Sequence, residues 1–330
     1  MSLGRVPGNI FGVGFGLAGL TTAWRVAAEL GLAPGWVATA LAVVAALVWL
    51  GSCWLYLRYT SASPRALLRD ASDMTAGPFL SLALITPMLL AADGIAPYSP
   101  NLAAVFVDIF LIAVVLVGGW FTGTWMRGGT DIDRLHPGYF LPTVAGGLVA
   151  ATCAADVGQL RLAQVMLGLG LICWAILGSM IMGRLMFRPP LPDALVPTTA
   201  IEVAPAAVAS VAYFSINHVH VDLFAAVLAG YGLLMVCAQL PLIPRYLRLK
   251  FTLATWAFTF SWAAVASTAL YWITAGHLAA GRLYSYLVLA AITVLIGGIA
   301  ARTLRAITRG QLLPAPVPSA SNAPSQTHPA

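Results

Sequence analysis

The sequence predicts an all-α polytopic membrane protein whose ten transmembrane helices form five helical hairpins around a central pore. Two observations predict this class. Hydrophobic residues make up 60% of the 330 residues and charged residues 8%, whereas soluble domains have about 45–50% and about 25%. The hydrophobic residues also fall in blocks of roughly 18–25, the length that a helix needs to cross about 30 Å of hydrocarbon. This pattern leaves no room for a separate soluble domain.

The ten predicted spans follow one another with short turns between them. The first is rich in glycine and ends at Arg25 and Glu29; because no small-residue cleavage site follows it, we expect a permanent helix rather than a signal peptide. The spans cover residues 10–28, 36–57, 78–96, 103–125, 138–155, 162–183, 199–216, 223–243, 252–275 and 281–301. They form one domain, residues 1–305, followed by a Pro/Ala/Ser-rich tail, residues 306–330, which we expect to be disordered and cytoplasmic.

Basic residues gather at one end of the predicted spans. Of the 17 Lys and Arg residues, fourteen lie in turns on one side, and Arg25, Arg161 and Arg282 lie on the other. Positively charged loops stay in the cytoplasm, so both termini are expected there. This topology accounts for the net charge of +6. A nucleic-acid partner is not expected, because the scattered charges form no basic stripe or groove.

Helix-distorting residues collect in the odd-numbered spans. Glycines, among them Gly12 and Gly14, open the first span, and Pro87, Pro142 and Pro205 lie in the third, fifth and seventh. A bent helix exposes backbone groups that lipid cannot satisfy but that a cavity can accept. We therefore expect the odd helices to surround a central space and the even helices to shield them. The alternative is the ordinary enrichment of proline and glycine in membrane helices.

Few ionisable residues lie within the spans. Asp108 in the fourth and Glu202 in the seventh are the deepest, and intramembrane charges often carry function, so both are candidates for proton or anion coupling. The alternative for Glu202 is an interfacial carboxylate satisfied by water. His218 and His220 share a turn without the spacing of a metal site, and His136 is expected in a wet cytoplasmic loop. No metal is predicted.

Enzyme motifs and cofactor sites are missing from the sequence. It contains no GxSxG and no HExxH motif. Its single lysine, Lys250, lies outside the predicted spans, which excludes a retinal Schiff base within a helix. We therefore predict neither a catalytic site nor a cofactor.

The ninth span has no charge but is rich in hydroxyls, including Thr255, Thr259 and Ser267. Hydroxyls on a helix can line a path for a hydrated ion, and a phenylalanine in a narrow apolar lumen can block that path. Phe260 has small residues at i+4 and i+7, so its ring has room to move. The alternative is that hydroxyls and small residues pack one helix against another.

Six segments together resemble one family of membrane proteins. Over most of residues 8–310 the chain is similar to the bacterial tellurite-resistance/C4-dicarboxylate transporters, which are related to the plant slow-type anion channels of the voltage-dependent anion channel superfamily. The segments that carry the resemblance are FGVGFGLAGLTTAW (11–24), HPGYFLPTVA (136–145), AP (204–205), SINH (215–218), GYGLL (230–234) and WAFTFSWAAVASTAL (256–270).

The resemblance implies an inner-membrane homotrimer with one pore for small anions in each subunit. It also implies that a phenylalanine of the ninth helix plugs the pore. The family's position in WAFTF falls on Phe260, with Phe258 as the alternative because the motif offers two rings. The helix kinks of the family correspond to Pro142 and Pro205, whereas Gly14 stands where relatives often carry proline.

Two departures from the family bear on the transported ion. Many relatives have a Glu-Pro pair in the sixth span where this chain reads Gly178-Ser179, and Glu202 stands where a neutral residue is more usual. The expected function is transport of small anions through a phenylalanine-gated central pore, with the lipid bilayer as the surroundings. The alternative is a proton-coupled exporter of sulfite, C4-dicarboxylate or a tellurium oxyanion, with Glu202 or Asp108 carrying the proton. A third alternative is a membrane enzyme or a passive assembly subunit.

Overall fold

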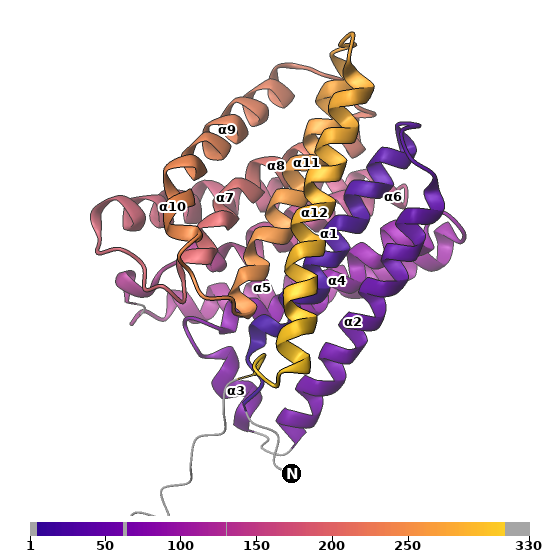
Figure 1. Ribbon diagram of the computed structural model, residues 1–330. Coiled ribbons are helices and arrows are strands. Elements are labelled where there is room, and N and C mark those ends of the chain that lie inside the picture. Colours follow the sequence, from indigo (N-terminus) through magenta and orange to yellow (C-terminus); the bar gives the residue numbers. More distant parts are fainter. Residues whose placement is uncertain (1–4, 62–64, 130, 314–330) are drawn as a thin grey trace, which may run out of the picture.

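The computed structural model describes residues 5–61, 65–129 and 131–313, and within these ranges the chain contains helices, turns and loops but no strand. Ten helical spans in this part of the chain are long and apolar enough to cross a membrane (Figure 1). The predicted all-α polytopic class is confirmed. The spans are Gly8–Glu29, Gly35–Ser61, Gly77–Ile95, Pro100–Met126, Pro137–Asp156, Leu160–Phe187, Val196–Asn217, Leu223–Tyr246, Leu253–Ala275 and Gly281–Thr308.

Successive spans pair as hairpins, each with one inner and one outer helix. The inner helices are α1 (Phe11–Glu29), α4 (Leu82–Leu90), α6 (Gly146–Asp156), α8 (Ala204–Asn217) and α11 (Ala257–Ala275). The outer helices are α2 (Gly35–Ser61), α5 (Pro100–Met126), α7 (Leu160–Phe187), α9 (Leu223–Gln239) with the short α10 (Ile243–Tyr246), and α12 (Gly281–Thr308). A short helix, α3 (Arg65–Ala71), follows α2.

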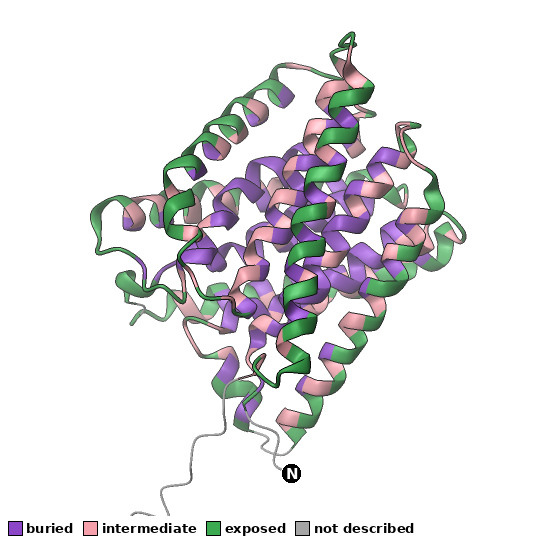
Figure 2. Ribbon diagram, in the orientation of Figure 1, coloured by how far each residue is buried: buried purple, intermediate pink, exposed green. Residues whose placement is uncertain are grey.

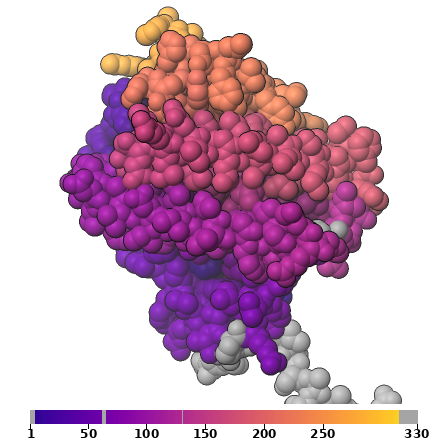
Figure 3. All heavy atoms as spheres, turned by 180° about the vertical axis from the view of Figure 1, so that it is seen from behind, coloured from indigo at the N-terminus to yellow at the C-terminus, as the bar shows by residue number. Residues whose placement is uncertain are grey.

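The inner helices form a closed ring in chain order. Each contacts the next, from α1 to α4, α6, α8 and α11, and α11 closes the ring against α1. Each inner helix also contacts the outer helix of its own hairpin. In the space-filling view from behind, successive segments form adjoining bands in sequence order, from indigo to orange (Figure 3).

Burial separates the two kinds of helix. In the most apolar stretch of each span, 72–89% of residues are buried in the first, third, fifth and seventh spans and 50% in the ninth, against 22–28% in the even spans. Figure 2 shows the same division, with buried segments at the centre and exposed ones outside. Large apolar side chains such as Leu116, Ile172 and Val294 point outward from the even helices, as lipid-facing residues do.

Every inner span begins with a 3-10 segment instead of a regular α-helical turn. These segments cover Gly8–Ile10, Gly77–Ser81, Pro137–Phe140, Val196–Val203 and Leu253–Trp256, and π turns follow at Ala91–Ile95 and Leu141–Ala145. Proline lacks a backbone N–H and glycine relaxes backbone sterics, so the Gly and Pro residues of the odd spans favour these irregular turns. The π turn Ala91–Ile95 lies at the other end of its span. We call the end of the bundle where the 3-10 segments and the Arg-rich loops lie the basic end.

Glycine allows the closest contact in the ring, between α1 and α11. A Cβ atom added at Gly16 would lie 2.7 Å from Thr259 Cβ and 2.7 Å from Trp256 Cε3, and one at Gly19 would lie 2.8 Å from Phe260 Cδ2. Side chains at these two positions would therefore push the helices apart. The Gly residues of FGVGFGLAG thus bring the backbone of α1 against the residues that carry the aromatic motif of α11.

The last helix is longer than predicted. It continues to Thr308, so the first residues of the expected tail, from Ala306, are helical. The rest of that tail, from residue 314 onward, lies outside the described residues.

Candidate transport passage

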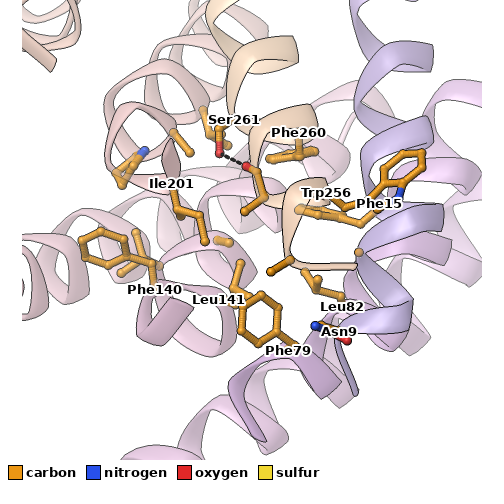
Figure 4. Close-up of a pocket in the computed structure, with 18 of the residues that line it drawn as sticks. Asn9, Phe15, Phe79, Leu82, Phe140, Leu141, Ile201, Trp256, Phe260 and Ser261 are labelled. Carbon is orange, nitrogen blue, oxygen red and sulfur yellow. Dashed lines mark hydrogen bonds between the residues drawn. The ribbon is translucent and has the colours of Figure 1, made fainter. Parts of the chain in front are cut away.

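A cavity lies inside the ring of inner helices near the basic end. All five inner spans contribute to its wall, including Phe15 from α1, Phe79 and Phe140 from the third and fifth spans, Pro205 from α8 and Trp256 from the ninth span. Figure 4 shows the labelled side chains pointing into this space from several sides. The wall is mainly apolar and aromatic.

A second, smaller cavity continues the first within the same ring. It is lined by residues from later turns of the same five spans, among them Thr22, Leu89, Thr152 and Ser267. Among the described residues that line the two cavities, none is charged and none belongs to an outer helix. The cavities therefore mark a neutral route along the axis of the ring.

Phe260 stands between the two cavities. Its side chain lines both of them, as does Val208 of α8. The ring of Phe260 stacks on Phe15, with 3.8 Å between the ring centroids and an angle of 21° between the planes. Because Gly19 has no side chain, the other flank of Phe260 fits against the backbone of α1. Rotation of this ring would change the width of the route where the two cavities meet.

Phe258, the alternative gate, lies elsewhere. Its ring packs edge-on against Tyr246 of α10, with 4.8 Å between centroids, and it lines neither cavity. Two residues along a helix amount to a rotation of about 200°, so the two rings of WAFTF point in nearly opposite directions. The sequence motif alone does not distinguish the two phenylalanines. In the structure, Phe260 lines the cavities inside the ring of inner helices and Phe258 does not.

Three other predicted residues lie in the walls. Gly12 and Pro205 line the first cavity, and Ser267 lines the second. The hydroxyl of Ser267 donates a hydrogen bond to the carbonyl of Ala263, 3.0 Å away on the same helix. This bond satisfies the hydroxyl proton inside an otherwise apolar wall.

Gly14, Pro87 and Pro142, predicted to kink the inner helices or to line the passage, do not line either cavity. A Cβ on Gly14 would lie 3.2 Å from Trp49 Cβ of α2. Pro87 lies inside α4 and borders a groove between α2, α4 and α5. Pro142 belongs to the π turn of the fifth span and lines neither cavity, and its carbonyl oxygen would lie 2.8 Å from a Cβ added on Gly118 of α5. Both prolines thus mark helix irregularities without facing the axis.

Thr255 and Thr259 also lie outside the cavities, which corrects the expectation from the hydroxyl pattern. The hydroxyl of Thr255 accepts a hydrogen bond from the Thr252 N–H, 3.3 Å away, as part of a capping box. Thr259 is buried against Gly16 and donates to the Trp256 carbonyl at 2.6 Å. Both hydroxyls stabilise the start of the ninth span, a role that spacing alone does not separate from pore lining.

The two carboxylates proposed for coupling have different surroundings. Glu202 lies in the 3-10 segment of the seventh span and is 5% exposed; its Oε1 has no hydrogen-bond partner among the described residues. Asp108 lies on the outer helix α5 and is half-buried, away from both cavities. Only Glu202 therefore belongs to the inner ring, although its neighbour Ile201, not Glu202 itself, lines the first cavity.

Several lining residues were not predicted. Phe15, Phe79, Phe140 and Trp256 give the first cavity its aromatic wall, and Asn9 supplies an amide whose Oδ1 has no partner in the described part of the chain. Phe15, Phe140 and Trp256 fall inside the quoted motifs, so the motifs contained the signal. Choosing among their residues required knowing which face of each helix turns to the axis.

Comparison with known proteins agrees with the geometry. Over residues 5–304 the sequence matches a family described as voltage-dependent anion channel. It is also 30% identical over 310 residues to the tellurite resistance protein TehA homolog of Haemophilus influenzae, in a match that covers 93% of this chain and 92% of that protein. The similarity therefore extends over all five hairpins.

Proposed function

The chain belongs to the voltage-dependent anion channel family, and from this premise we propose that its five inner helices enclose a passage for small anions that the ring of Phe260 closes. The observation that carries the proposal is the position of Phe260 between two neutral cavities lined by the same five spans. A neutral wall suits conduction, since an anion that binds weakly can also leave. An apolar constriction beside an aromatic ring excludes water and hence ions.

Removal of the ring tests this function. Phe260→Ala should raise anion flux in proteoliposomes, because the two cavities then join without a plug. Phe258→Ala is the matched control: it removes the same ring from the same motif, at a position packed on Tyr246. Unchanged flux in Phe260→Ala, or an equal increase in both variants, would contradict the gate.

A proton-coupled exporter of sulfite, C4-dicarboxylate or a tellurium oxyanion is the second candidate. It is favoured by the buried carboxylate of Glu202, with its unpartnered Oε1 in an inner span, and by the similarity to a tellurite resistance protein. In the same assay, flux driven by an imposed pH gradient and lost in Glu202→Gln supports this candidate. Asp108→Asn is the control, since Asp108 lies on an outer helix.

The location and assembly form part of the proposal. We place the protein in the bacterial inner membrane with both termini in the cytoplasm, because the basic residues gather at one end of the bundle. The exposed apolar surface of the outer helices supports contact with lipid and with further copies of the chain, which we propose to form a homotrimer. Each copy has its own inner ring.

A further inference from the structure

The residues one helical turn beyond the second cavity form a further layer around the same axis. Four of the residues that line the second cavity are each followed, four positions later, by a polar residue on the same inner span. The pairs are Leu89 and Asp93, Thr152 and Asp156, Val211 and Ser215, and Ser267 and Tyr271. Residues four apart lie on the same face of a helix. This layer, which we call the acidic ring, lies at the end of the passage opposite the basic end.

Direct contacts join the acidic ring to the second cavity. Thr22, which lines that cavity, donates a hydrogen bond to Asp93 Oδ2 at 2.6 Å. Asp156 and Ser215 lie on the neighbouring inner helices α6 and α8, and the carboxylates of Asp93 and Asp156 are close enough to interact electrostatically. Tyr271 lies in the field of both. These contacts show that the side chains of the layer come together in space, as the four-residue spacing indicates.

Carboxyl groups outnumber cations around the acidic ring. Glu29 of α1 adds a third carboxylate, while Arg25 of α1 is the nearby cation. Arg25 donates to the backbone carbonyl of Asp93, from Nε at 3.0 Å and from a terminal nitrogen at 2.6 Å, so it is held beside the main chain. The other titratable neighbour is the buried thiol of Cys153 on α6.

Exposure shows which carboxylate meets water. Asp93 is 4% exposed, whereas Asp156 and Glu29 are exposed. On the passage proposed above, an anion that leaves the second cavity at this end would pass these groups. Salt screens a buried charge only weakly, so Asp93 when ionised repels an anion strongly, whereas the exposed carboxylates of Asp156 and Glu29 add a weaker, salt-dependent repulsion.

We propose that Asp93 and Asp156 act as an electrostatic gate, in series with Phe260, which lets anions pass when the two carboxylates bind protons from the solution at that end. The proposal rests on the anion passage proposed above and adds its regulation: the aromatic ring closes the middle by size, and the acidic ring closes one end by charge. Acid on that side opens the second barrier, because a neutral carboxyl group no longer repels the anion.

Chloride or nitrate flux into proteoliposomes, followed from about pH 5 to about pH 7.5, tests the proposal. The Phe260→Ala variant lacks the aromatic barrier, so the acidic ring alone limits its flux. That flux should fall as the pH rises, because the carboxyl groups lose their protons. Adding Asp93→Asn and Asp156→Asn should raise flux about tenfold at the higher pH and abolish the pH dependence. Asp156→Asn alone, at the exposed position, should give about a threefold rise with little risk to folding.

A control and the outcomes separate the two proposals. Asp193→Asn, on an exposed carboxylate that pairs with Arg245, should leave the pH profile of Phe260→Ala unchanged. If Phe260→Ala conducts and both Asp variants keep its pH profile, the electrostatic gate is refuted and the anion passage stands. If Phe260→Ala conducts no more than the unmodified protein, the aromatic gate fails, and the pH profile of Asp156→Asn in the unmodified background then decides the acidic ring alone.

Discussion

His136 shows how a single residue beside the passage supports its wall. The side chain is fully buried; Nδ1 accepts a hydrogen bond from the Gly138 N–H at 3.1 Å. The imidazole stacks on Phe79, with 6.2 Å between centroids, and Phe79 lines the first cavity. The sequence predicted a wet loop here, which is wrong for His136: residues 131–134 are exposed, but Leu135 and His136 are buried. Because the imidazole of His136 is buried, its protonation in acid should destabilise the folded protein.

Mild acid should destabilise the protein through His136. Burial lowers the pKa of His136 from 6.5 to about 4, and Arg184 acts in the same direction, while backbone groups of Thr75 and Met74 oppose it. The unfolded chain therefore binds a proton that the folded chain does not. The contribution of His136 to the free energy of unfolding is fully present above about pH 6.5. It falls by about 3 kcal/mol as the pH drops towards 4.

Thermal unfolding of the purified protein in detergent at several pH values measures this effect. His136→Gln should lose most of the decline between pH 6.5 and 4. His220→Gln, on an exposed histidine, should retain it. Equal pH profiles for the unmodified protein and His136→Gln would show that His136 is not the group responsible.

At the scale of elements, the contact between α1 and α11 sets the geometry around Phe260. The prediction at this scale is that Gly16→Ala destabilises the protein by about 1–3 kcal/mol, because its Cβ would lie 2.7 Å from Thr259 Cβ. Gly123→Ala is the control on the outer helix α5, where no atom lies within 4 Å of the added Cβ. That variant should be neutral or more stable by about 0.5–1 kcal/mol. Tm values for the two variants decide the point.

The sequence predicted the elements well and their faces poorly. Apolar length predicted the ten spans, and the Gly and Pro residues of the odd spans correctly indicated which helices lie inside. Pro87 and Pro142 lie in irregular parts of inner spans yet line neither cavity. A distorted backbone identifies a helix, not the side that turns to the axis. That side is fixed by packing between spans far apart in sequence, such as Gly19 against Phe260.

At the scale of the whole molecule, the distribution of basic residues predicts its orientation. Ser61 lies at the basic end and His220 at the opposite end, and both are exposed. In a variant whose four cysteines are replaced by alanine, a membrane-impermeant maleimide should label His220→Cys in intact spheroplasts. Ser61→Cys should react only after lysis. The reverse pattern would invert the topology and put the acidic ring in the cytoplasm.

Both cavities are enclosed by segments of a single polypeptide. Copies that associate through their outer helices would therefore work as parallel, self-sufficient units. A cell that makes a blocked copy beside an intact one should lose flux in proportion to the blocked fraction, without dominant inhibition. Each copy that carries a mutation would then lose only its own flux, and association of copies would serve a purpose other than building the route itself.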